Sequence, residues 1–79
     1  MSTTEAIRAL AVGESFAEMR RVEVKHYNAK AVQAELRKMN NALGVIASRC
    51  DGEFVIERAF SLTNSQEHIL YGLVVTREK

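Results

Sequence analysis

The sequence predicts an α+β domain in which one main α-helix packs on a three- or four-stranded antiparallel sheet. Apolar residues recur at helical spacing in the middle of the chain, whereas the C-terminal part consists of apolar runs separated by turn residues. The chain has 79 residues, no proline and no linker, repeat or low-complexity segment. We therefore expect a single small domain over residues 1–79.

The N-terminal segment is expected to begin with a short helix. Ser2 and Glu5 have the spacing of a capping box, in which two side chains satisfy free backbone N–H groups at the start of a helix. This helix should end before Gly13. In the following segment, residues 15–25, apolar side chains occur at even spacing, which predicts an extended conformation.

The main helix is the clearest element of the sequence. Asn28 is a favourable N-cap residue, because its side chain can accept a hydrogen bond from a free N–H group of the first turn. Gly44 stands where a left-handed C-terminal cap is expected, so the helix is predicted to end there. The apolar stripe between these residues follows helical spacing and consists of Val32, Leu36, Met39 and Leu43.

A β-hairpin is predicted directly after this helix. The dipeptide Asp51-Gly52 favours the positive φ angles of a type I′ turn, and apolar segments flank it on both sides. Residues 45–50 and 53–60 are therefore expected to form two paired strands.

Residues 68–77 are predicted to form a further long strand that is apolar on both faces. Ile69, Tyr71, Leu73 and Val75 share one face, and Leu70 and Val74 share the other. Such a strand must be covered twice, either by the N-terminal segment or by a second protomer, so a homodimer through Ile69–Val75 is one expectation. Gly72 interrupts the strand, which is typical of a bulge or of a close backbone approach.

The sequence offers little for catalysis. Cys50 is the single cysteine, so no intramolecular disulfide can form and a reducing, cytoplasmic compartment is expected. Cys50 with His26 or His68 would be the one nucleophile-base combination, but a small, partly buried thiol is the favoured interpretation. No export signal or membrane-spanning segment is recognisable.

The remaining motifs also favour a binding protein over an enzyme. The His, Cys and acidic residues lack the spacing of a metal site, and no glycine-rich phosphate loop occurs. A domain of this size has a thin core, which leaves little room for a deep active site. We therefore expect no enzymatic activity, no metal and no cofactor.

The formal net charge of +1 hides an uneven distribution along the chain. Residues 20–49 contain seven basic and two acidic residues and carry +5, whereas the rest of the chain carries −4. Such an asymmetry creates a local potential that can steer an anionic partner.

The polar face of the main helix is a candidate nucleic-acid surface. Lysine and arginine can neutralise phosphate, glutamine and asparagine can contact adenine, and Ala34 would permit close approach. A turn at Asp51-Gly52 could then act as a wing with Arg49 beside it. The candidate binding set is Arg20, Arg21, Lys25, Lys30, Gln33, Arg37, Lys38, Asn41 and Arg49. An ordinary solvated helix face is the competing interpretation, and Glu35 favours it.

Three segments, ALAVGESF, AVQAELRKMNNALG and SRCDGEFVIERAF, resemble a class of small phage-encoded accessory proteins. The matching positions are Val12, Gly13, Glu14, Ser15, Phe16, Leu43, Gly44, Arg49, Gly52 and Arg58. The long apolar C-terminal strand departs from that class. The resemblance implies a virus or prophage protein that binds and redirects host machinery, and it implies no activity.

Two functional hypotheses follow. The first is association with DNA or RNA through the basic helix face. The alternative is a stoichiometric inhibitor whose basic face fits an acidic or nucleic-acid-binding host protein, such as a polymerase or a CRISPR effector.

Overall fold

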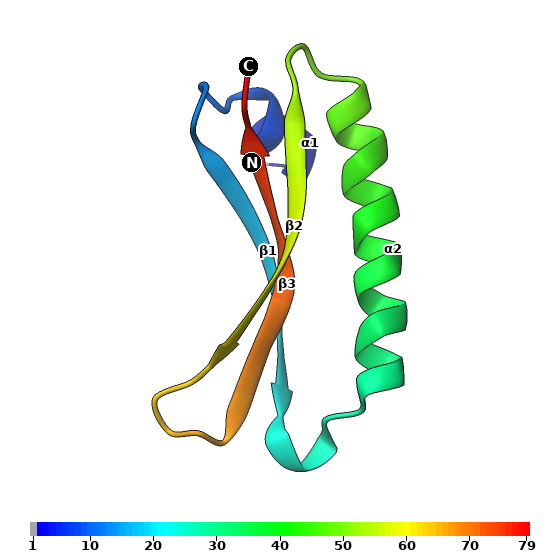
Figure 1. Ribbon diagram of the computed structural model, residues 1–79, viewed down its shortest axis with the longest axis vertical. Helices are drawn as coiled ribbons and strands as arrows, with labels where there is room; N and C mark the ends of the chain where they lie inside the picture. Colours follow the sequence, from blue (N-terminus) through cyan, green and yellow to red (C-terminus); the bar gives the residue numbers. More distant parts are fainter. Residues whose placement is uncertain (1) are drawn as a thin grey trace.

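The computed structural model describes residues 2–79 and consists of two α-helices, one 3-10 turn and three strands (Figure 1). The elements in chain order are α1 (Thr3–Arg8), β1 (Ser15–Glu23), η1 (Val24–His26), α2 (Ala29–Ser48), β2 (Phe54–Leu62) and β3 (His68–Arg77). One main helix packs on an antiparallel sheet, so the predicted α+β class is confirmed. The N-terminal helix and the strand at 68–77 are confirmed as well, and of the extended segment predicted at 15–25, residues 15–23 form a strand whereas Val24–His26 is a 3-10 turn.

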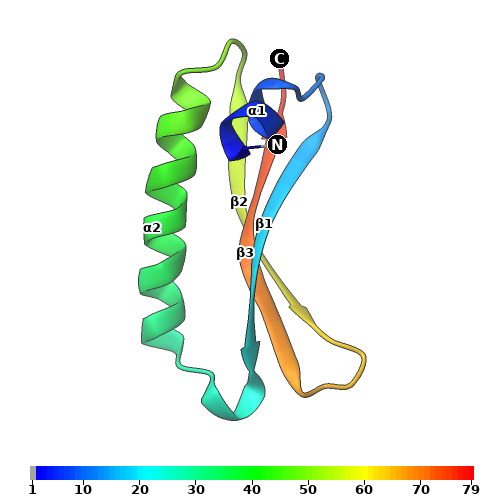
Figure 2. The same ribbon diagram turned by 180° about the vertical axis from the view of Figure 1, so that it is seen from behind.

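The sheet has the strand order β1-β3-β2, and β3 pairs antiparallel with both neighbours. Consequently β1 and β2 run in the same direction, and α2 connects them across one face of the sheet as in a split βαβ unit. Both α1 and α2 lie on that face, as the two opposite views show (Figures 1 and 2).

The core lies between α2 and the central strand. Leu36 and Leu43 of α2 and Leu73 and Val75 of β3 are almost completely buried. Ile7 of α1 belongs to the same cluster, so the N-terminal helix covers the same face as α2. The opposite face of β3, which carries the partly buried Leu70 and Val74, is covered by no helix of the described residues.

The predicted end of the main helix at Gly44 is wrong. Asn28 is the N-cap, and its Oδ1 accepts a hydrogen bond from the Ala31 N–H at 3.1 Å, but the helix continues to Ser48. Gly44 has no positive φ angle and stands inside the helix. The reason is that Ile46, three residues after Leu43, lies on the buried side and packs against the core. Burial of this side chain outweighs the helix-interior cost of glycine, about 1 kcal/mol.

The predicted strand at 45–50 and the hairpin at Asp51-Gly52 are also wrong. Residues 45–48 form the last turn of α2, and Gly52, with a φ of 113°, makes the connection from the helix into β2. The β-hairpin instead joins β2 to β3 through residues 63–67, where the Thr63 N–H donates to the His68 carbonyl at 3.1 Å. A dipeptide that favours positive φ predicts a turn, but it does not specify which elements the turn connects.

Gly72 lies where β1 approaches β3 very closely, as expected for a glycine inside a strand. It pairs with Met19 on one side and Ala59 on the other. A Cβ atom at Gly72 would lie 2.8 Å from the Met19 Cα and would also collide with the Glu18 carbonyl oxygen. These are backbone atoms of the neighbouring strand, so no side-chain rotation can relieve the contact.

We expect the variant Gly72→Ala to lower the free energy of unfolding by about 3 kcal/mol, because overpacking against backbone forces the strands apart. Urea denaturation followed by circular dichroism measures this change. A variant as stable as the wild type would show that β1 and β3 are less closely paired at this point.

The variant Gly44→Ala should instead raise the free energy of unfolding, by about 0.5–1 kcal/mol, because alanine is the better residue inside a helix. A Cβ atom at this position meets nothing within 4 Å. The same denaturation experiment measures the effect. Destabilisation would contradict the helical conformation of Gly44 and would favour the left-handed cap that the sequence predicts.

Candidate nucleic-acid interface

The outer side of α2 carries a basic stripe. Since the apolar stripe of the helix faces the core, the helical rotation of 100° per residue directs Lys30, Arg37 and Asn41 away from the sheet. All three are exposed, and so is Lys38, which stands beside them. We call these four residues, Lys30, Arg37, Lys38 and Asn41, the α2 outer face.

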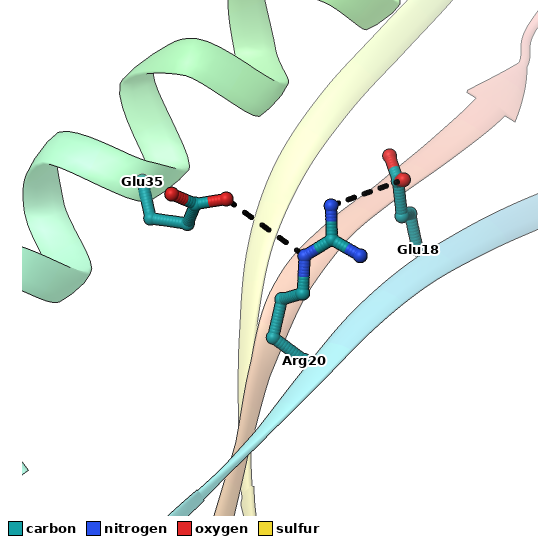
Figure 3. A network of polar contacts seen from close by, with 3 residues as sticks. All are labelled: Glu18, Arg20 and Glu35. Carbon is teal, nitrogen blue, oxygen red and sulfur yellow. Dashed lines mark ion pairs between the residues drawn. The ribbon is translucent and has the colours of Figure 1, made fainter.

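Arg20 belongs to the predicted binding set, but it is held by acidic groups of the chain itself. Its Nε lies 3.8 Å from Glu35 Oε1 on α2, and its Nη2 lies 3.7 Å from Glu18 Oε1 on β1 (Figure 3). Arg20 therefore connects the strand to the helix. Because the three side chains are partly exposed, each pair is expected to contribute less than about 1 kcal/mol.

Three other members of the predicted set also have partners within the chain. Gln33 accepts a hydrogen bond from Arg58 Nη1 of β2 at 2.6 Å. Arg21 Nη2 lies 3.1 Å from His68 Nδ1, and Lys25 Nζ lies 3.3 Å from Glu23 Oε2. Of these partners only Glu23 is an anion, so the positive charge of Lys25 is compensated, whereas Arg21 and Gln33 are held by neutral or basic groups.

The structure does not bring the whole predicted set onto one surface. Arg20 and Arg21 are consecutive in β1 and point to opposite faces of the sheet. Arg49 is the C-cap of α2, whereas Lys25 precedes its N-terminus, and a helix of 20 residues separates these ends by about 30 Å. The predicted wing does not exist, because no hairpin forms at Asp51-Gly52.

The α2 outer face brings together three cations of the predicted set, whereas Arg21 on β1 and Arg49 at the C-terminal end of α2, which also form no ion pair in the described residues, lie apart from it. Within residues 2–79, Lys30, Arg37 and Lys38 form no ion pair. Glu35, the one acidic residue of α2, is turned toward β1 by its contact with Arg20. Lys38 stands three residues after Glu35 but forms no ion pair with it, so the outer face presents three cations that no carboxylate of the described residues pairs with.

The nucleophile and base that the sequence suggested are far apart. Cys50 follows the C-terminus of α2, whereas His26 precedes its N-terminus, and His68 pairs with Glu23 at that same end of the sheet. The Cys50 Sγ donates to the Ile46 carbonyl at 3.3 Å. Among the described residues no group of three or more His, Cys, Asp or Glu side chains could hold a metal ion.

Two open pockets lie near the end of the sheet where β1 finishes. One of about 520 Å³ is lined by Glu23, Val24, Lys25, Glu67 and His68. The other, of about 270 Å³, is lined by Tyr27, Phe60, Ser61, Leu62 and Ile69. Neither contains a residue of the α2 outer face.

The sequence interpretation missed the structural role of two arginines. Arg58 holds Gln33 of α2, and Arg77 donates from Nη1 to the Leu10 carbonyl at 2.9 Å. No local motif marks either residue, because their partners are distant in the sequence.

Comparisons with protein-family models, curated proteins and solved structures found no match. The resemblance to small phage accessory proteins therefore stays a prediction. In residues 2–79, no helix combines the length and the apolar character needed to cross a membrane.

Proposed function

We propose that this protein is a non-enzymatic binding protein that associates with nucleic acid through the α2 outer face. The observation that carries the proposal is the row of cations on that face, Lys30, Arg37 and Lys38, which form no ion pair with any other described residue. Unpaired basic side chains are free to neutralise phosphate, whereas Arg20 and Lys25 would first have to leave their carboxylate partners.

The shape of this face also fits a duplex. Lys30 and Arg37 are two helical turns apart, about 10 Å along the axis, and point the same way. An α-helix fits the major groove of B-form DNA, and α2 is exposed along its whole outer side with the sheet behind it (Figures 1 and 2). Asn41 adds an amide that can contact a base, and the small, exposed Ala34 lies between the two cations.

Phosphate contacts of this kind make binding sensitive to salt. Each neutralised phosphate of a B-DNA duplex contributes about −0.9 to the slope of log affinity against log salt concentration. Three cations therefore give a slope of about −2.7. A salt slope of this size distinguishes binding by these three cations from weak association driven by the net charge of +1 of the whole chain.

The double variant Lys30→Gln and Arg37→Gln should bind a mixed-sequence DNA duplex at least about tenfold more weakly at 50 mM salt, because two phosphate contacts are lost. Its salt slope should fall in magnitude by about 1.8. Fluorescence anisotropy between about 50 and 200 mM salt measures both quantities. The matched control is Arg8→Gln with Lys79→Gln, which removes the same charge outside α2 and should bind like the wild type.

Equal weakening by the two double variants would show that net charge alone drives binding and would contradict the assignment to α2. Single-stranded DNA and RNA are titrated in parallel. If the wild type binds none of these ligands at micromolar concentration, association with nucleic acid is refuted, and the protein-inhibitor hypothesis is the one to pursue.

A further inference from the structure

Within residues 2–79, no strand pairs with the outer edge of β1. In the sheet order β1-β3-β2, β1 has a neighbour on one side only. Hydrogen bonds from the Val24 N–H to the Glu67 carbonyl and from the Arg77 N–H to the Glu14 carbonyl show that the even-numbered residues of this segment face β3. Because the bonding direction alternates along a strand, Ala17, Met19 and Arg21 direct their N–H and C=O groups outward. Such an edge can pair with another strand.

The sequence of β1 is complementary to itself when the strand pairs antiparallel with a second copy. In the register centred on Met19, Glu18 lies opposite Arg20 of the second copy, and Arg20 lies opposite its Glu18. Phe16 and Val22 meet in the same way. All four side chains project from the face that α2 covers.

The hydrogen-bonding alternation selects this register. Residues with outward backbone groups must face each other, so the symmetric alternatives are displaced by an even number of residues. A shift of two residues in one direction centres the register on residue 18 and places Glu18 opposite Glu18 of the second copy. A shift of two residues in the other direction centres it on residue 20 and places Arg20 opposite Arg20. Like charges directly opposite destabilise a strand pair, whereas opposite charges contribute about 0.2–1 kcal/mol each. Only the register centred on Met19 also pairs the full length of the strand.

We propose that the chain forms a symmetric homodimer by antiparallel pairing of β1 with β1 of a second copy. The two three-stranded sheets then form one continuous six-stranded sheet. The two-fold axis passes between the two Met19 residues, perpendicular to the sheet, so both α2 helices lie on the same face. This interface is the edge of β1, not the face of β3 at Ile69–Val75.

The other edge strand, β2, lacks this complementarity. Its central residues are Glu57 and Arg58. The symmetric registers centred on these two residues place Glu57 opposite Glu57 or Arg58 opposite Arg58. Charges at the middle of an edge strand oppose edge-to-edge pairing, and here no symmetric register converts them into ion pairs.

The side chains that would form the new pairs are accessible. The side chains of Glu18 and Arg20 are 29% and 48% exposed, and they already lie together on one face of β1 (Figure 3). The nearest other charge on that face is Glu35, 3.8 Å from Arg20. Pairing with a second copy therefore adds a carboxylate to an arginine that is already oriented.

Charge reversal tests the register. Light scattering at micromolar concentration should give the wild type about twice the chain mass of 8.9 kDa. Glu18→Arg and Arg20→Glu should each be monomeric, because each places like charges opposite each other twice. An equimolar mixture of the two variants should form a heterodimer, because every pair is then opposite in sign.

The matched control is a mixture of Glu57→Arg and Arg8→Glu, which carry the same charge changes away from β1 and should each remain dimeric. A monomeric wild type overturns the proposal. Dimers that persist in both β1 variants place the interface elsewhere and overturn it too, as does a mixture that stays monomeric.

Cross-linking provides a measurement that does not depend on the stability of the charge variants. In a Cys50→Ser background, Met19→Cys should form an interchain disulfide on mild oxidation, since the two copies of residue 19 face each other across the axis. Glu57→Cys in the same background should not. The absence of cross-linking through residue 19, or equal cross-linking at residue 57, would refute pairing through β1.

Discussion

The contact between the apolar stripe of α2 and the central strand β3 determines the arrangement of the whole molecule. Leu36 and Leu43 on the helix and Leu73 and Val75 on the strand are almost inaccessible to solvent. Burial of these side chains fixes the rotation of α2, because a helix has one apolar side to bury. The rotation in turn decides which basic residues face outward. The strand β3 is also the centre of the sheet, because it pairs with both neighbours, and β1 and β2 are the two edges.

The fold divides the basic segment into two groups with different roles. Arg20 and Lys25 form ion pairs with Glu18, Glu35 and Glu23, so part of their charge is compensated within the chain, and Arg21 is held by a hydrogen bond with His68 of β3. Lys30, Arg37 and Lys38 project from the outer side of α2 without such partners in the described residues. The +5 of residues 20–49 is therefore not a continuous basic surface. Three of its cations without an ion pair lie together on α2, which is why the proposed contact with nucleic acid is assigned there.

The proposed dimer and the proposed nucleic-acid contact use different surfaces and do not compete. Pairing through β1 occupies a sheet edge, whereas the α2 outer face points away from the sheet. A two-fold axis perpendicular to the sheet keeps both helices on one side, so two basic faces would be presented together. Arg20 contributes to the strand edge rather than to the basic surface, because Glu18 and Glu35 hold it next to the sheet. The uncovered face of β3 with Leu70 and Val74 takes part in neither contact.

The sequence by itself determined the α+β class, the start of the main helix at Asn28, the short N-terminal helix and the strand at 68–77, since capping residues and apolar spacing act locally. It also identified the helix that carries the unpaired cations. Only the tertiary structure decided where α2 ends, because Gly44 is compatible with a cap or a helix and the burial of Ile46 selects the helix. Because the helix takes up residues 45–48, no strand is left to form the hairpin predicted at Asp51-Gly52, and the observed hairpin joins β2 to β3 through residues 63–67. The partners of Arg20 and Gln33 also had to come from the structure, because Glu35 and Arg58 approach them through space and not along the sequence.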